Sequence, residues 1–289
     1  MSLVLPIHFH RFFYILLIFW CMTGKVMAGN DGFSYGPRAL GTGQISVLHT
    51  DAWSNFNNIG ALGWLKQTSV AAGYENRFNQ GAFSQIAFCA AIPTKKLGVA
   101  GISVSKFGGE IFNQSRAQLA WGKAFGLASI GLQAQWYQVA AVNFQTRHHL
   151  LINFGGLAQL TPKIQFGASI SNVNQAKASE FQDEKIPIIV KGGISYMPSK
   201  KVKLMAEVQE DLDLETTLKV GIEYQVMEKF WLRTGFNTQT YLGSGGLGLE
   251  WRNWQFNYAI CNQPQVGWSN SLGLNYQFGS AKTEAPKSK

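Results

Sequence analysis

Apolar and polar residues alternate one by one through most of the chain from residue 67 onward. In LKVGIEYQV, residues 218–226, the apolar side chains share one parity, and Lys, Gly, Glu and Gln share the other. The same alternation recurs in IQFGASIS at 164–171 and in SLGLNYQF at 271–278. Successive side chains of a β-strand point to opposite faces, whereas an amphipathic helix repeats every 3.6 residues. We therefore expect an all-β protein whose strands have one apolar and one polar face.

Marking off each alternating run gives about fourteen strands, most of them roughly 9–12 residues long, which suits tilted strands that cross a bilayer. Their expected starts are residues 67, 82, 97, 114, 127, 146, 163, 186, 201, 215, 229, 242, 253 and 267. Tight turns alternate with longer loops along most of the chain, as in outer-membrane barrels whose short turns face the periplasm. Because lipid cannot satisfy an open sheet edge, we predict a closed transmembrane antiparallel β-barrel over 67–279, with twelve or sixteen strands as alternatives.

The composition agrees with a barrel and disfavours several other classes. Only 14% of residues are charged, 13% are aromatic, 31 are glycine, and the mean hydropathy is −0.03. A soluble protein usually has about 25% charged residues, and a helical membrane protein is far more apolar. The net charge of +9 comes from scattered basic residues rather than from a Lys/Arg run, so we expect no nucleic-acid partner.

The two ends of the chain lie outside the expected barrel. Phe12 to Cys21 is an apolar run after a weakly basic start, and Val26-Met27-Ala28 resembles a cleavage site, which predicts a signal peptide over 1–28. A lipoprotein signal using Cys21 is the alternative, but bulky residues precede that cysteine. Residues 280–289 read as a flexible periplasmic tail. A disulfide between Cys89 and Cys261 has no support from the sequence.

The inward strand faces and the segment before the first strand supply the candidate binding residues. Charges of both signs on the inward faces predict internal salt bridges, or a path for a ligand. Residues 29–66 are rich in Gly and Asn and do not alternate, so we expect a periplasmic plug or hatch that folds into the lumen, with a lead-in strand as the alternative. The candidate lumen and plug contacts are Asp51, Trp53, Asn55, Asn58, Arg116, Lys219, Glu223, Arg233, Glu250 and Arg252.

The C-terminal strand carries a second kind of candidate site. Leu272, Leu274, Tyr276 and Phe278 are expected to face lipid, and the strand is expected to pair with the first strand near Thr68 to Phe78. It also has the pattern that barrel-assembly machinery reads in outer-membrane proteins: polar, x, Gly, x, x, hydrophobic, x, aromatic. The anchors of this expected assembly signal are Ser271, Gly273, Tyr276 and Phe278.

The run GPRALGTGQISVLHTDAWSNFNNIGAL, residues 36–62, resembles the N-terminal segment of PorV/PorQ proteins in the FadL-like outer-membrane superfamily. The matching residues are Gly36, Arg38, Gly41, Gly43 and Asp51. Asn58-Ile59-Gly60-Ala61-Leu62 stands where those proteins have an Asn-Pro-Ala-like motif, so the proline is replaced by isoleucine. The resemblance implies a fourteen-stranded barrel in the outer membrane of a Gram-negative, Bacteroidetes-type bacterium.

Two functions follow from this resemblance. PorV-like members imply an accessory or binding subunit of a secretion or envelope-biogenesis complex of the type IX kind, with a protein partner. FadL-like members imply a transporter of small hydrophobic substrates. A porin-like role would need an open lumen. The expected partners are outer-membrane lipid and, during insertion, barrel-assembly machinery. The sequence has no nucleotide-binding or metal-protease motif, and His148-His149 would point to opposite faces, so no enzyme activity, cofactor or metal site is expected.

Overall fold

The computed structural model describes residues 34–177, 186–211 and 216–279. The expected signal peptide and tail lie outside these residues. Within these residues there are four short helical elements, α2 (Pro37–Gly41), η1 (Ala52–Asn55), η2 (Ile59–Trp64) and η3 (Gly81–Phe83). The strands are β1 (Ser69–Asn76), β2 (Ser84–Thr94), β3 (Gly98–Gly108), β4 (Phe112–Phe125), β5 (Ala128–Ala141), β6 (Arg147–Thr161), β7 (Ile164–Ser171), β8 (Ile189–Ser199), β9 (Val202–Asp211), β10 (Thr217–Met227), β11 (Phe230–Asn237), β12 (Leu242–Trp251), β13 (Trp254–Gln263) and β14 (Gly267–Gln277).

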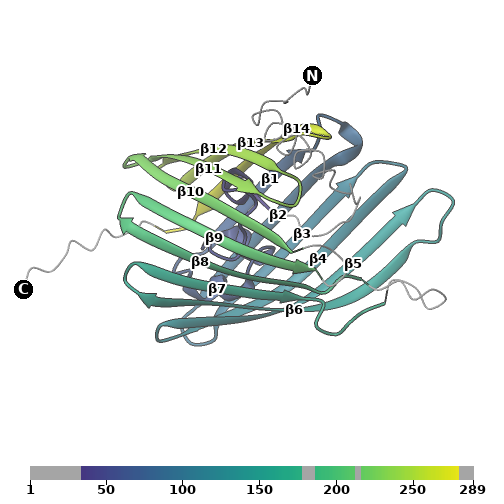
Figure 1. The fold of residues 1–289 in the computed structure, drawn as a ribbon. Helices are drawn as coiled ribbons and strands as arrows, with labels where there is room; N and C mark the ends of the chain where they lie inside the picture. The colour runs from purple at the N-terminus through teal and green to yellow at the C-terminus, as the bar shows by residue number, and fades with distance from the viewer. Residues whose placement is uncertain (1–33, 178–185, 212–215, 280–289) are drawn as a thin grey trace, which may run out of the picture. The chain divides into compact units, whose positions relative to one another are not determined.

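These fourteen strands form one closed antiparallel barrel in which each strand pairs with its neighbours in sequence (Figure 1). The seam joins β1 to β14, with Ser69 opposite Gln277 and Asn76 opposite Asn270. Every strand starts within three residues of its predicted start. The predicted strand count and the predicted pairing of SLGLNYQF with the first strand are therefore confirmed.

The two ends of the barrel differ in their connections. At one end, six turns of two or three residues join β2 to β3, β4 to β5, β6 to β7, β8 to β9, β10 to β11 and β12 to β13. The connections at the other end reach seventeen residues, between β7 and β8. We call the first end the short-turn rim and the second the long-loop rim.

Alternation along the strands sorts the side chains as predicted. In β14, Ser271, Gly273 and Asn275 are buried toward the lumen, whereas Leu272, and Phe278 just after the strand, are exposed on the outside. Aromatic residues point outward from the strand ends near the short-turn rim. They are Trp121, Tyr196, Tyr224, Phe230, Trp251, Trp254, Tyr276 and Phe278. An apolar outer wall with an aromatic belt is the expected surface of a barrel in a bilayer.

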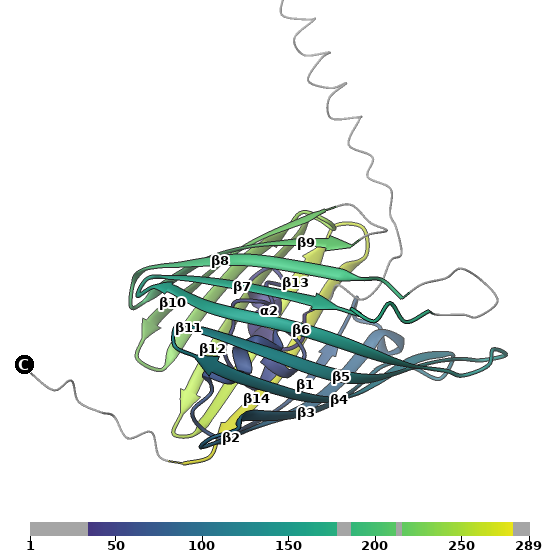
Figure 2. The same cartoon turned by 90° about the horizontal axis from the view of Figure 1, so that it is seen from below.

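The segment before β1 folds into the barrel (Figures 1 and 2). Residues 34–66, which we call the plug, include α2, η1 and η2, and most of their side chains are buried. Their hydrogen bonds reach β9, β10 and β14 on one side and β2, β5 and β6 on the other. Across residues 34–177, 186–211 and 216–279, no helix is both long enough and apolar enough to cross a membrane.

One strand of the wall stops early. β7 has 8 residues and its partner β6 has 15, so β7 pairs only with Phe154–Thr161 of β6. Beyond the end of β7, Val173 N still donates to Ile152 O at 2.9 Å, and the side chain of Asn174 then takes the place of a strand backbone: its Oδ1 accepts from Ile152 N at 2.8 Å, and its Nδ2 donates to Leu150 O at 2.8 Å. The part of β6 that precedes Phe154 is therefore bordered on this side by a loop rather than by a strand.

Candidate functional site: the plugged lumen

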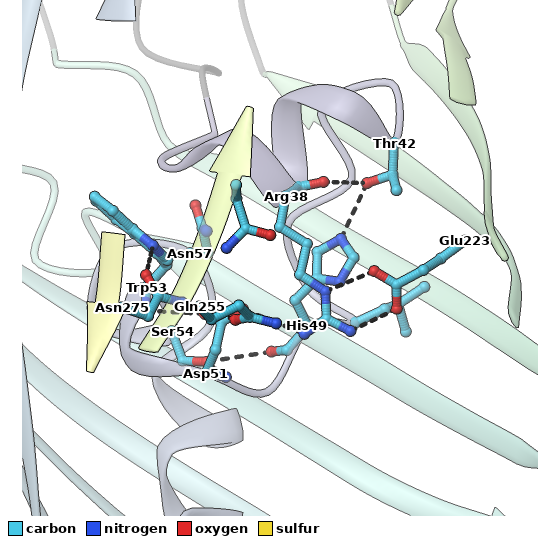
Figure 3. Close-up of polar contacts among 12 residues, drawn as sticks. Arg38, Thr42, His49, Asp51, Trp53, Ser54, Asn57, Glu223, Gln255 and Asn275 are labelled. Atoms are coloured by element: carbon cyan, nitrogen blue, oxygen red, sulfur yellow. Dashed lines mark hydrogen bonds and ion pairs between the residues drawn. The ribbon is translucent and has the colours of Figure 1, made fainter. Parts of the chain in front are cut away.

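An ionic cluster joins the plug to the wall (Figure 3). Arg38 of α2 donates to both carboxylate oxygens of Glu223 in β10, from Nε at 2.8 Å and from Nη2 at 2.6 Å. Its Nη1 lies 3.3 Å from Asp51 Oδ2. On the wall, Arg233 of β11 donates from Nε to Glu223 Oε2 at 2.6 Å. Two arginines thus share one buried carboxylate, with a second carboxylate beside them.

Burial opposes the charge of Arg38, but the carboxylate of Glu223 outweighs this effect and raises the pKa of Arg38 above its ordinary value. His49 of the plug lies beside the cluster, with Nε2 3.0 Å from Thr42 Oγ1. Burial, followed by the positive charges of Arg38 and Lys203, lowers the pKa of His49 well below 6.5. His49 is therefore neutral at physiological pH, and the cluster would resist its protonation.

A second cluster holds the next stretch of the plug. Glu207 of β9 accepts through Oε2 from two backbone amides, Ser46 N at 2.6 Å and Val47 N at 2.8 Å. Lys219 of β10 donates to Glu207 Oε1 at 2.9 Å and to the plug carbonyl of Gln44 at 3.1 Å. Both side chains are almost fully buried, at 0% and 1% exposure. The wall carboxylate and the wall ammonium therefore satisfy backbone groups of the plug that strand pairing cannot reach.

Glycines in the wall let the plug backbone approach closely. A Cβ added at Gly131 of β5 would lie 2.5 Å from Ile59 O, and one at Gly221 of β10 would lie 2.5 Å from Thr42 O. A Cβ at Gly235 of β11 would collide with the backbone of Thr42 and Gly43. Since these strands lie on different sides of the lumen, no layer of side chains separates the plug from the wall there.

Amide side chains and the Trp53 indole make further hydrogen bonds between the plug and the wall. Trp53 Nε1 donates to Asn275 Oδ1 of β14 at 2.9 Å. Asn55 Nδ2 donates to Ala90 O of β2 at 3.1 Å, and Gln133 Nε2 of β5 donates to Asn55 O at 2.5 Å. Asn58 caps η2 by accepting from Gly60 N at 3.0 Å, and its Nδ2 reaches Gly156 O of β6 at 3.0 Å.

The structure brings most of the sequence candidates together. Arg116 of β4 donates to the Tyr35 hydroxyl of the plug at 2.7 Å. The candidates that contact the plug or belong to it are Asp51, Trp53, Asn55, Asn58, Arg116, Lys219 and Glu223. Arg233 lies on the wall beside them and donates to Glu223.

Two candidates lie elsewhere. Glu250 and Arg252 are exposed at the short-turn rim, where the Arg252 guanidinium lies 5.2 Å from the Trp251 ring centre. Glu250 has the inward parity, but it is the second-last residue of β12 and lies beyond the packed part of the lumen, so the expectation that both residues contact the lumen or the plug is corrected. Parity fixes the face of a strand residue and not its height along the barrel.

The candidate set omitted four residues that seat the plug: Arg38, His49, Lys203 and Glu207. Lys203 of β9 donates to Leu48 O of the plug at 2.6 Å. The signal for Arg38 was present in Gly36-Pro37-Arg38, where an arginine directly follows two conformationally special residues. Gly36 has a φ of 86°, and a Cβ there would lie 2.8 Å from the Trp53 ring.

An apolar cluster lies next to the end of β7. Tyr137 of β5, Leu151 of β6 and Ile186 pack together, and Val139 and Ala176 lie against them. Tyr137, Leu151 and Ile186 are each exposed by less than a tenth. This cluster is the one apolar patch in the described residues that combines inward wall positions with the loop after β7.

The fold and the seated plug define a class: this chain has the architecture of a plugged outer-membrane β-barrel. No protein-family model matches the chain, and no curated protein matches it in sequence. The chain is similar in structure to the TodX monoaromatic hydrocarbon channel deltaS2 mutant (TM-score 0.65, 10% identity, 85% of this chain and 98% of that chain). It is also similar to the Pseudomonas putida toluene transporter TodX (TM-score 0.60, 9% identity, 85% and 98% coverage). At this identity, the likeness concerns the fold.

Proposed function

We propose that this protein lies in the outer membrane of a Gram-negative bacterium and passes small hydrophobic molecules, while its plug keeps the lumen closed to water-soluble solutes. The observation that carries the proposal is the way the plug fills the barrel. Its backbone touches glycines on opposite walls, Arg38 forms an ion pair with Glu223 of β10, and Glu207 of β9 and Lys219 of β10 hydrogen-bond to its backbone. Within the described residues, these contacts obstruct a solute that needs a continuous water column.

The apolar cluster beside β7 supplies a route of another kind. Tyr137, Leu151 and Ile186 offer an apolar surface on the inner side of the wall. Next to them, the hydrogen bonding of β6 is continued by one backbone bond, from Val173 N to Ile152 O, and by the side chain of Asn174. These three hydrogen bonds are easier to break than a full strand ladder, because two of them are lost when one side chain rotates. An apolar molecule resting on the cluster could leave sideways into lipid at this point.

The structural neighbours support the same proposal. The similar solved proteins are described as a monoaromatic hydrocarbon channel and as a toluene transporter. We therefore take compounds of the size and polarity of monoaromatic hydrocarbons as the first substrates to test.

A pair of adjacent substitutions tests the route. Leu151→Asn puts an amide into the apolar cluster, whereas Leu150→Asn puts the same amide on the outer face, where Leu150 is 59% exposed. Bacterial cells that produce each variant at equal levels in the outer membrane would be given radiolabelled toluene. We expect Leu151→Asn to slow uptake at least severalfold and Leu150→Asn to leave it near the native rate. Equal uptake by cells with and without the native protein would rule out the proposal.

The secretion-accessory hypothesis rests on the motif of residues 36–62, and the structure gives those residues a role inside the barrel. Arg38 and Asp51 belong to the ionic cluster, and Gly43, with a φ of 74°, lies against the backbone of Phe236. Ile59 occupies the first position of η2, where proline is also favoured, so the missing proline leaves the plug intact. The residues of the motif thus hold the plug in the barrel, and the role of a secretion accessory subunit stays a prediction. Gentle purification from native membrane with a stoichiometric protein partner would favour it.

A further inference from the structure

The charges of the barrel are sorted between its two rims. Nine basic residues lie on the short-turn rim with two acidic ones, and none of the described ion pairs joins these cations to a carboxylate. The basic residues are Lys66, Lys95, Lys96, Lys123, Lys163, Lys200, Lys201, Lys229 and Arg252, and the acidic ones are Glu228 and Glu250. Described residues of the long-loop rim carry both signs in similar numbers: Arg77, Lys106, Arg147, Lys177 and Lys191 with Glu75, Glu110, Glu210 and Asp211.

The cations follow the circumference instead of forming one patch. Each of the six short turns has a basic residue in it or within three residues of it. All are exposed except Lys123, which is half-buried, with its ammonium 5.6 Å from the Phe125 ring centre. A protein that docks on one side of the barrel would need cations on that side only. A ring of cations matches a partner that surrounds the barrel.

The neighbouring layer of side chains identifies that partner. The outward aromatic belt lies on the strand ends next to the same turns, and it includes Trp121, Trp251 and Trp254. Aromatic belts lie at the level of lipid headgroups, and lysine and arginine next to them extend their charged ends toward the headgroup phosphates. The cations are therefore held where phosphates of the adjacent leaflet would lie.

We propose that the short-turn rim is a binding surface for anionic phospholipid headgroups, and that it enriches such lipids around this end of the barrel. The proposal rests on the membrane placement under Proposed function, but not on transport of any solute. A basic side chain near an anionic bilayer contributes on the order of a fivefold preference, which salt weakens.

Tryptophan quenching by brominated lipid measures this preference, because three tryptophans lie in the belt. The native full chain would be reconstituted into phosphatidylethanolamine vesicles that contain brominated phosphatidylglycerol or, in parallel, brominated phosphatidylethanolamine. We expect brominated phosphatidylglycerol to quench at about fivefold lower mole fraction in low salt, and this advantage to shrink in 0.5 M NaCl by screening, as it does for exposed charges.

A matched pair of triple variants locates the effect. Lys95→Gln, Lys96→Gln and Lys200→Gln remove three charges from the short-turn rim. Lys106→Gln, Arg147→Gln and Lys177→Gln remove three from the long-loop rim. We expect the first triple to lose most of the preference and the second to keep it. An equal loss in both triples would assign the effect to net charge and overturn the proposal, as would a native protein without any preference.

A further control separates this proposal from the proposed membrane placement. If neither brominated lipid quenches the native protein, the barrel is not surrounded by lipid, and the placement itself fails. Equal quenching by both lipids leaves the placement intact and refutes only the headgroup proposal. Binding of an acidic soluble protein to the native rim, with equal quenching by the two lipids, would likewise refute it.

Discussion

Glu223→Gln should unseat the plug. In the native protein Glu223 is the shared acceptor of Arg38 and Arg233, and its side chain is 8% exposed. The neutral amide leaves the guanidinium groups of Arg38 and Arg233 close together, with the Asp51 carboxylate beside Arg38, whereas an unseated plug would let water reach both guanidinium groups. Removing one partner of a buried ion pair costs about 3–5 kcal/mol. The fraction of molecules with an unseated plug should rise about 140-fold to 4,000-fold.

Two native cysteines report this change without an added probe. Cys89 packs against Ala52 and Trp53, and Cys261 packs against Leu40, so each thiol is covered by a different part of the plug. Maleimide labelling of the folded protein in detergent, in a Cys21→Ser background, measures how often each thiol is uncovered. We expect both labelling rates to rise with the fraction of unseated molecules.

Glu228→Gln is the matched control, because Glu228 is exposed in the turn after β10 and should leave both rates unchanged. Replacing both members of the plug–wall pair, Arg38→Met with Glu223→Met, should recover part of the protection, since the plug then no longer carries a guanidinium that has lost its Glu223 partner. Labelling of Glu223→Gln within twofold of the native rate would refute the reasoning that this carboxylate seats the plug.

Three further predictions use the same labelling assay or a simple assembly assay. The lowered pKa of His49 means that an unseated His49 binds a proton more readily. The protection of the two thiols from maleimide should therefore be complete above pH 6.5 and fall by about tenfold per pH unit below it, once labelling rates are normalised to those of the unfolded protein. The His49→Gln variant should show no such fall. Gly235→Ala should raise labelling strongly, but Gly243→Ala, with nothing within 4 Å of its added Cβ, should not; similar rates would contradict the close fit. Phe278→Ala should lower the yield of folded barrel in the outer membrane, measured by heat-modifiable migration, and an unchanged yield would argue against the assembly signal.

The wall was predictable because its pattern is local. Period-2 alternation assigns Leu272 to the outside and Ser271 to the lumen without knowledge of any other strand, and short turns fix the pairing of consecutive strands. Closure of the barrel could be predicted because lipid offers no hydrogen-bond partners to an open sheet edge. The fourteen strands could therefore be drawn from the sequence, and their starts agree with the structure within three residues.

The plug contacts were harder to predict because they join residues far apart in sequence. Arg38 and Glu223 are 185 residues apart, and no periodicity relates a helical turn in the plug to a height on β10. Inward parity selected Glu223 correctly, yet the same rule also selected Glu250, which lies beyond the packed lumen. Residues such as His49 show no pattern at all, since the plug has no regular strand or long helix from which a face could be read.

The pairing of Trp53 with Asn275 has a consequence for biogenesis. These residues are 222 positions apart, and Asn275 belongs to the last strand, which also closes the wall against β1. Contacts of such long sequence separation form late, because the intervening chain must be ordered first. The plug is synthesised before any strand, but it gains this partner only when the seam closes. Closure of the seam and formation of this plug contact are thus one step. A barrel that stalls before β14 is paired would have both an open seam and an incompletely bound plug.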